Sequence, residues 1–247
     1  MAYVAGHQLV LYHVETKTQR FIPGRADTEA ITALAFSQCK SYVAVAERAE
    51  KGVITVYDLT TTTGSPRKRV LEGDVGSKVR LVPIREKQPK RSSKLGHDVD
   101  LNPLTSFHPP SPPPTTQEYV SMSFSPDGKW VIAQGGAPEW NVTLWNWERC
   151  KQLACVPAKA LGSDAGAVLQ VRFSAHDTSL ASCAGEGVFR TFKCAESGVR
   201  ALPDVKLPPA KSGSGAGGEK NYTAHCWLPD DSEDKGDDSQ GGTERRE

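Results

Sequence analysis

The sequence lacks the features that would assign it to several common classes of protein. No apolar run approaches the ~20 residues that a membrane-spanning helix needs. The start, MAYVAGHQLVLYHV, has neither the basic residues nor the sustained apolar core of a signal peptide. The formal net charge is +1, so no overall field favours nucleic acids or membranes. We therefore expect a soluble, intracellular protein.

Motifs for metal binding and catalysis are also missing. The six cysteines include no C-x-x-C pair, and the six histidines show no H-E-x-x-H or similar ligand spacing. In an intracellular chain we expect the cysteines to be reduced and mostly buried. Cys183 or Cys226 could form a nucleophile with a histidine, but both fall in predicted strands, where a buried inert thiol is the better interpretation. The sequence predicts no enzymatic activity, no metal and no cofactor.

One dipeptide resembles part of a phosphate-binding loop. Gly128 and Lys129 would fit the end of G-x-x-x-x-G-K-[ST], which opens a helix and cradles phosphates with its backbone. However, Trp130 follows Lys129, and the next residues are an apolar run with no helical pattern. The stretch VSMSFSPDGKW instead predicts a strand, a Ser-Pro-Asp-Gly turn and a second strand.

Three segments of the sequence repeat this strand-turn-strand pattern and align on a Phe-Ser pair. In each, an alternating strand ends in Phe, a short turn leads to a second strand of small apolar residues, and a third strand ends in an aromatic residue. We expect these aromatic side chains to be core residues that pack between neighbouring units. The pairs, separated by 21, 21 and 19 residues, are Phe36 with Tyr57, Phe124 with Trp145, and Phe173 with Phe192.

Partial copies flank the three units. The residues YVAGHQLVLYHV and TQRFI match the second, third and fourth strands of a unit without its first strand, and YTAHCWLPDD matches a first strand and its turn. Four short strands repeating every ~40–45 residues are typical of a WD-repeat β-propeller. We therefore predict an all-β fold, a partial or open propeller of about four blades with disordered inserts. The arc should not close, which leaves unpaired strand edges.

Two stretches interrupt the repeat. Residues 72–118 carry eight of the 17 prolines and, from Lys78 to Lys94, seven basic residues against one acidic residue. Residues 199–220 are rich in Pro, Gly and Ser. Both compositions predict segments without packed structure, and we expect the first to be mobile and dispensable for folding. The predicted organisation is an incomplete and a full blade in 1–71, the basic insert in 72–118, two blades in 119–198, the linker in 199–220, a first strand in 221–230 and an acidic disordered tail in 231–247.

The turn GGAPEWN, between the second and third strands of one unit, holds the candidate interaction residues Glu139 and Trp140. In a propeller this turn opens on the same face as the links between blades, so both inserts should emerge beside it. A Trp in such a turn can be an interface anchor or can pack over its own blade. The sequence supports both interpretations.

The motifs GHQLVLYHVETKTQRFIPG, ITALAFS, YVAVAE, ITVYDL and YVSMSFSPDGKWVIAQ, followed by NVTLWNWE, RKRVL and NYTAHCW, resemble the N-terminal region of one WD-repeat family. This is the family of cilia- and flagella-associated proteins linked to the inner-arm dyneins of motile axonemes. The resemblance implies two propellers followed by a long coiled coil. No heptads follow the repeats in this chain, so we expect it to be a truncated member.

The resemblance also implies a function. We expect a non-enzymatic scaffold in the ciliary axoneme and cytoplasm, with inner dynein arm or regulatory-complex proteins as partners and no nucleic acid, membrane or small-molecule substrate. One alternative is a scaffold of another assembly, such as ciliary transport or signalling. A second is a propeller hydrolase. That hydrolase would need carboxylates or histidines that converge on the central channel, and the strand patterns predict no polar residue at matching positions of successive units.

Overall fold

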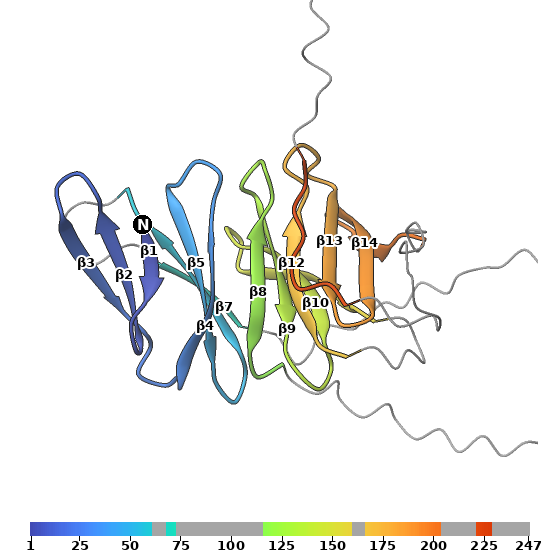
Figure 1. Ribbon diagram of the computed structural model, residues 1–247, viewed down its shortest axis with the longest axis horizontal. Coiled ribbons are helices and arrows are strands. Elements are labelled where there is room, and N and C mark those ends of the chain that lie inside the picture. Colours follow the sequence, from blue (N-terminus) through green and yellow to red (C-terminus); the bar gives the residue numbers. More distant parts are fainter. Residues whose placement is uncertain (61–67, 73–115, 160–165, 204–220, 229–247) are drawn as a thin grey trace, which may run out of the picture.

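The computed structural model describes residues 1–60, 68–72, 116–159, 166–203 and 221–228. Four antiparallel sheets stand in a row, from β1–β3 at the left of Figure 1 to β12–β15 at the right. The elements of the described residues are all strands, and these residues include no helix that could cross a membrane. The all-β prediction and the open arc are confirmed.

Strands that are consecutive in the chain pair with one another in every sheet. The first sheet has three strands, and each of the other three has four. The first sheet contains β1 (Ala2–Val4), β2 (Gln8–His13) and β3 (Thr18–Pro23); the second β4 (Ala30–Phe36), β5 (Tyr42–Arg48), β6 (Val53–Asp58) and β7 (Lys68–Glu72); the third β8 (Tyr119–Phe124), β9 (Trp130–Gly135), β10 (Asn141–Asn146) and β11 (Lys151–Pro157); the fourth β12 (Val168–Phe173), β13 (Leu180–Gly185), β14 (Val188–Ala195) and β15 (Gly198–Ala201).

The Phe-Ser pairs mark one recurring turn between the first two strands of a blade. In the first two complete blades the serine forms two hydrogen bonds with one residue across the turn. Its N–H donates to the carbonyl of that residue, and its hydroxyl accepts from the N–H of the same residue. The pairs are Ser37 with Tyr42 and Ser125 with Trp130. Gly128 lies in the second of these turns with a φ of 72°, a conformation that glycine adopts without strain. The dipeptide Gly128-Lys129 is therefore part of a tight turn between strands.

Neighbouring sheets pack face to face, and the aromatic residue of each third strand points toward the preceding sheet. Tyr57 packs with Leu9 of the first sheet, Trp145 with Ile54 of the second, and Phe192 with residues of the third. A fully buried large apolar side chain contributes about 1.5–3 kcal/mol. Small residues in the second strands, such as Ala44 and Ala133, let the sheets approach closely. Of the six repeat aromatics, Phe36 is half-buried and the other five are buried.

The first sheet contains three of the four strands of a complete blade. Its three strands pair in the order β1-β2-β3, which corresponds to the second, third and fourth strands of a complete blade. Each complete blade begins with an inner strand, and these strands, β4, β8 and β12, lie next to one another along the arc. The first sheet has no such strand in the described part of the chain.

Three boundaries differ from the sequence prediction. Residues 199–201 belong to β15, so the linker begins later than position 199. β15 pairs with the edge of β14, and Gly198 makes the tight turn between the two strands with a φ of 140°. Residues 116–118 contact the second blade, so they are a structured end of the insert. Residues 221–228 pair through a single bridge at Asn221 and form no ladder. The predictions for residues 73–115, 204–220 and 229–247 concern residues outside the described part of the chain.

Candidate interaction surface

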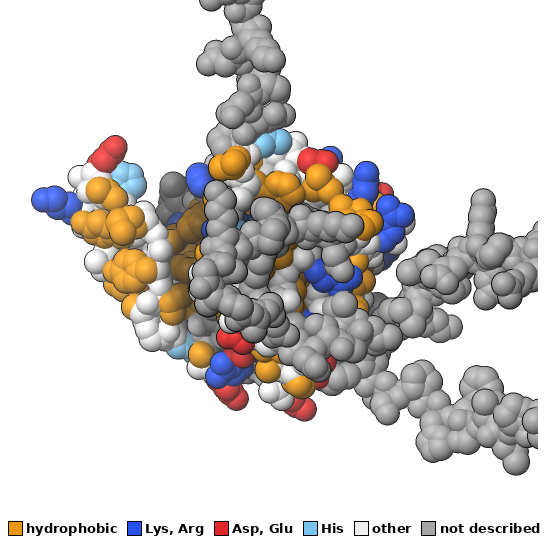
Figure 2. Space-filling model, turned by 45° about the vertical axis from the view of Figure 1, so that its right-hand side comes forward, with side chains coloured by type: hydrophobic (Ala, Val, Ile, Leu, Met, Phe, Trp, Pro, Cys, Tyr) orange, Lys and Arg blue, Asp and Glu red, His pale blue; other side chains and the backbone are white. Residues whose placement is uncertain are grey.

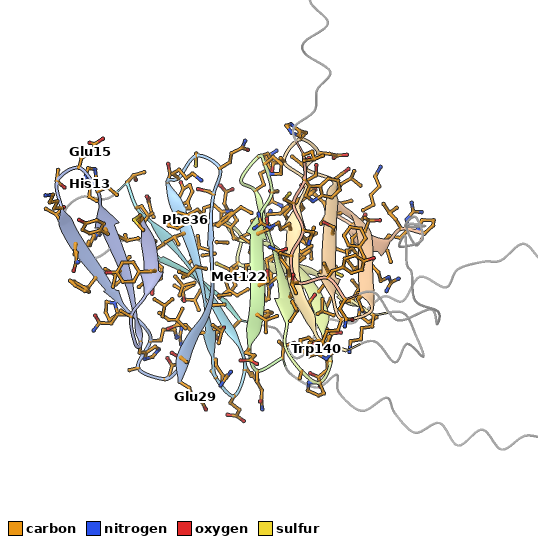
Figure 3. All side chains as sticks on the ribbon, in the orientation of Figure 1. His13, Glu15, Glu29, Phe36, Met122 and Trp140 are labelled. Atoms are coloured by element: carbon orange, nitrogen blue, oxygen red, sulfur yellow. The ribbon has the colours of Figure 1, made fainter. Side chains whose placement is uncertain are left out.

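The loops that join the second and third strands of each complete blade all lie at the same edge of the row of sheets. We call this edge the Trp140 face. These loops are residues 49–52, 136–140 and 186–187. Figure 3 shows Trp140 at this edge together with Glu29, while His13 and Glu15 lie at the opposite edge. The described flanks of both inserts lie on the Trp140 face. Thr116 accepts a bond from Gly52 beside the end of β7, and Asn221 bridges to Glu186.

Trp140 is half-buried and does not project freely into solvent. Its backbone closes the loop, because its N–H donates to the carbonyl of Gly136 at 3.1 Å and its carbonyl accepts from Ala158 at 3.0 Å. Its ring packs against the core between the third and fourth sheets. The ammonium of Lys159 lies 5.3 Å from the ring centroid, within cation–π range. The preceding residue, Glu139, is half-buried in the same loop.

The backbone of Trp140 has a φ of 50°. A bulky residue in the left-handed region is uncommon, and such conformations cost about 1–3 kcal/mol unless the surroundings hold them. Here the two backbone hydrogen bonds and the packed ring hold it. The loop therefore leaves part of a fixed indole and part of a lysine side chain accessible to solvent. This arrangement is compatible with both interpretations of Trp140.

An ion pair next to this loop joins the second and third blades. Both the Nε and the terminal nitrogen of Arg48 donate to one carboxylate oxygen of Glu118. Glu118 also accepts a backbone bond from Gly136. The Arg48 side chain is 48% exposed, so the pair itself adds little stability. Its effect is to fix the residues that lead into β8.

The inner strands line a pocket of about 460 Å³. β4, β8 and β12 supply its walls, with the polar side chains of Ser121, Ser123, Gln170 and Arg172 among them. Figure 3 labels Phe36 and Met122 on two of these strands. Ser121 and Gln170 occupy the same position of successive units, three residues before Phe124 and Phe173. The expectation that no polar residue recurs at matching positions is therefore wrong.

Each of these recurring polar residues bonds to the backbone of the segment that packs next along the arc. The hydroxyl of Ser121 accepts from the N–H of Val171 at 3.1 Å and also donates to the Val171 carbonyl. The amide oxygen of Gln170 accepts from the N–H of His225 at 2.7 Å. Because they satisfy backbone groups where blades meet, they hold the blades in register. Sequence reasoning missed them since a single Ser or Gln in a strand carries no motif.

The thiols differ in their surroundings. Cys183 and Cys194 are buried, and burial raises the pKa of each to about 12. Cys39, Cys150 and Cys226 are exposed, so the expectation that the cysteines are mostly buried is wrong for these three. They lie in turns or in segment 221–228, where no second sheet covers them. Hydrogen bonds from Ser37 and Ser41 lower the pKa of the Cys39 thiol to about 7.

A second polar cluster lies between the first and second blades. Glu47 is fully buried, and its Oε1 accepts from the N–H of Arg25 at 2.8 Å and from the hydroxyl of Thr28 at 3.2 Å. His7 Nε2 is 3.4 Å from the same oxygen. The cluster fixes the connection from β3 to β4. No group of three or more His, Cys, Asp or Glu side chains suited to a metal ion occurs among the described residues.

Comparison with known proteins connects this arc to cilia. No family model matches the chain. It is 26% identical over 228 residues to cilia- and flagella-associated protein 57 of Mus musculus, an alignment that covers 92% of this chain and 14% of the relative. It is 24% identical over 193 residues to cilia- and flagella-associated protein 43 of Chlamydomonas reinhardtii, covering 75% of this chain and 10% of that protein.

The chain thus spans a small part of the length of each relative. The resemblance to cilia- and flagella-associated proteins that the repeat motifs indicated is confirmed. The two relatives also support the predicted location in a cilium or flagellum.

Proposed function

We propose that this chain is a non-enzymatic WD-repeat scaffold of the motile ciliary axoneme. The observation that carries the proposal is the similarity to cilia- and flagella-associated protein 57 across 92% of the chain. Neither relative is named for an enzymatic activity. The fold supports the proposal, because stacked four-stranded sheets present several loops at each end of a rigid arc, and such loops are where scaffolds bind partners.

The partners that we propose are components of the inner dynein arms or of their regulatory complex. The motifs shared with the axonemal family support this assignment. On the chain itself, the Trp140 face supplies a surface with an indole, the cation of Lys159 and the flanks of both inserts. Tryptophan is enriched in protein–protein interfaces and among the residues that contribute most to their affinity.

The test is to tag the protein at its own locus in a cell with motile cilia, remove the membrane with detergent and fractionate the cilia. We expect the tag to remain with the axoneme. Loss of the gene should lower inner-arm dynein heavy chains, while outer-arm heavy chains remain as the internal control. A tag released with the soluble matrix, or motile along the cilium, would instead assign the chain to ciliary transport. Unchanged inner arms in the mutant would overturn the dynein part of the proposal.

A further inference from the structure

Serine hydroxyls join the inner strands of the third and fourth sheets. The hydroxyl of Ser121 accepts from the N–H of Val171, and the hydroxyl of Ser123 accepts from the N–H of Phe173, both at 3.1 Å. These two N–H groups lie on the edge of β12 that is not paired with β13. The serines of β8 therefore satisfy the inner edge of the next blade.

The junction between the second and third sheets lacks these serines. Ala33 and Ala35 of β4 occupy the positions of Ser121 and Ser123, three residues and one residue before the repeat phenylalanine. Both alanines lie in the apolar cluster between the two sheets. A methyl group cannot accept a hydrogen bond, so this junction has no counterpart of the two serine bonds.

The donors at this junction are the N–H groups of Met122 and Phe124. The N–H of Ser125 bonds to Trp130 across the ladder with β9, and the N–H groups of a strand point alternately to its two edges. Those of Met122 and Phe124 therefore point away from β9. Among the described strands β8 pairs with β9 alone, so both donors lie on an unpaired strand edge beside β4.

The pocket of about 460 Å³ between the inner strands lies at these donors. Its lining includes both alanines, Met122 and Phe124. Figure 3 labels Phe36 and Met122 on the two strands that meet there. The volume is within the ~300–1,000 Å³ typical of ligand sites. The missing hydroxyls thus coincide with a cavity that has room for a ligand.

The charged residues of this pocket are cationic. Lys40 and Arg172 contribute to its lining, and none of the lining residues is Asp or Glu. In the view of Figure 2 the acidic side chains lie mainly along the upper and lower edges of the molecule. The pocket therefore complements a ligand of negative charge.

Lys40 also occupies a position that favours glycine. It lies three residues after the serine of the Phe-Ser pair and has a φ of 61°, and the same position of the next blade is Gly128, with a φ of 72°. In both turns the N–H of this residue donates to the serine carbonyl, at 3.0 and 2.9 Å. A lysine in the left-handed region carries strain that glycine avoids, and such strain is concentrated at binding and catalytic sites. Its place beside the pocket supports a binding role.

We propose that this pocket binds an extended acidic segment of a partner protein along the inner edge of β8. The N–H groups of Met122 and Phe124, two residues apart on a strand, are separated by roughly 6.5–7 Å, so one phosphate or carboxylate group cannot bond to both. Alternate carbonyls of an extended peptide have the same spacing and accept from both. A carboxylate of the peptide pairs with Lys40. The site uses the second, third and fourth sheets and does not depend on the axonemal role proposed above.

Amide hydrogen exchange of the full chain, followed by NMR, tests the donors. In the free protein we expect the amides of Met122 and Phe124 to exchange faster than those of Val171 and Phe173. The probe is a pool of N-acetylated, C-amidated hexapeptides built from valine, threonine, aspartate and glutamate. It should slow the exchange of Met122 and Phe124 at least several-fold. A pool with lysine and arginine in place of the acidic residues should not, and neither should inorganic phosphate.

Two variants separate the donors from the cation. Ala33→Ser combined with Ala35→Ser adds the hydroxyls of the next junction, which should protect both amides and abolish binding of the acidic pool. Lys40→Gly removes the cation and the strained backbone, so we expect an unchanged or higher melting temperature and binding at least tenfold weaker. Lys17→Gly is the matched control. Lys17 has a φ of 53° in the turn between β2 and β3, and its variant should bind as the wild type does.

Three results would overturn the proposal. Equal protection of all four amides in the free protein would show that the chain itself satisfies the donors. Slowing by phosphate as strong as that by the acidic pool would assign the pocket to a small anion. Absence of slowing by the acidic pool, or equal slowing by the basic pool, would show that the pocket does not select acidic peptides.

Discussion

The indole of Trp147 donates a hydrogen bond from Nε1 to the carbonyl oxygen of Gly128, 2.6 Å away. This bond joins the residue after β10 to the turn between the first two strands of the same blade. The Trp147 ring also lies 4.8 Å from the ring of Tyr42 in the preceding blade and 6.2 Å from that of Phe124. One buried side chain therefore connects a turn, its own sheet and the neighbouring sheet.

Replacing Trp147 should separate the packing from the hydrogen bond. Trp147→Ala leaves a large cavity between the second and third blades, and we expect it to lower the free energy of unfolding by about 3–5 kcal/mol. Trp147→Phe keeps a ring at this site and loses the bond to Gly128, so we expect a smaller loss, part of it about 1 kcal/mol for the bond. Urea unfolding followed by circular dichroism measures both. Lys129→Ala, in the same turn and exposed, is the control and should change little. A loss under 1 kcal/mol for Trp147→Ala would contradict this role.

The exposed and buried thiols should react at different rates. Hydrogen bonds from Ser37 and Ser41 lower the pKa of Cys39 to about 7, so much of this thiol is thiolate at neutral pH. Iodoacetamide at pH 7 should modify Cys39 before Cys150 and Cys226, and should reach Cys183 and Cys194 only after unfolding. Ser37→Ala removes the first of these bonds and should slow the reaction of Cys39 several-fold. Mass spectrometry of the peptides gives the order; modification of Cys183 in the folded protein at the rate of Cys39 would contradict the assignment.

The repeat was predictable from sequence because it rests on side-chain alternation and on aromatics at fixed spacing. Phe36, Phe124 and Phe173 end their strands as the spacing predicts, since one inward side chain per strand must fill the space between sheets. The strand β15 was missed because GVRA is only four residues long and has no aromatic residue; it pairs with the edge of β14, and its Val199 and Ala201 pack against the neighbouring core. Local sequence cannot show a strand that exists because of its neighbour.

The interaction surface was less predictable. The sequence located Trp140 in its turn, but its half-burial follows from the core between the third and fourth sheets, to which residues far along the chain contribute. The polar bonds between blades, such as Ser121 to Val171, join residues 50 positions apart. Such contacts depend on how the sheets are stacked, and no pattern within one unit indicates them.

Acid should release segment 221–228 from the last blade. Burial, and secondarily the charge of Arg172, lowers the pKa of His225, although a hydrogen bond involving Ser182 opposes this. A histidine with a lower pKa in the folded state is neutral there, so the unfolded state binds more protons as the pH falls. Its contribution to stability is therefore full above the unfolded pKa of about 6.5 and decreases below it.

Hydrogen exchange of the His225 amide measures this release, because that N–H donates to Gln170 and is protected while the segment is bound. We expect faster exchange at pH 5 than at pH 7.5, after correction for the intrinsic rate, while the amides of β9 remain protected. His225→Gln should remove most of the pH dependence. His13→Gln, in β2 of the first sheet, is the control and should retain the pH dependence. Equal protection of the wild-type amide at both pH values would show that His225 does not control the segment.

Trp140 should anchor the protein in the axoneme through the part of its indole that solvent reaches. Truncating an interface anchor typically costs about 2 kcal/mol or more, which is roughly a thirtyfold change in affinity. We expect Trp140→Ala to reduce incorporation of the tagged protein into detergent-extracted axonemes by about that factor. Lys159→Ala is the matched variant, because it removes the cation over the ring and leaves the indole in place. Unfolding of the purified variants must be measured in parallel, since Trp140 also packs on the core between the third and fourth sheets. If Trp140→Ala lowers the free energy of unfolding and the folded fraction still incorporates normally, the indole serves to close its blade, and the contact with the axoneme lies elsewhere.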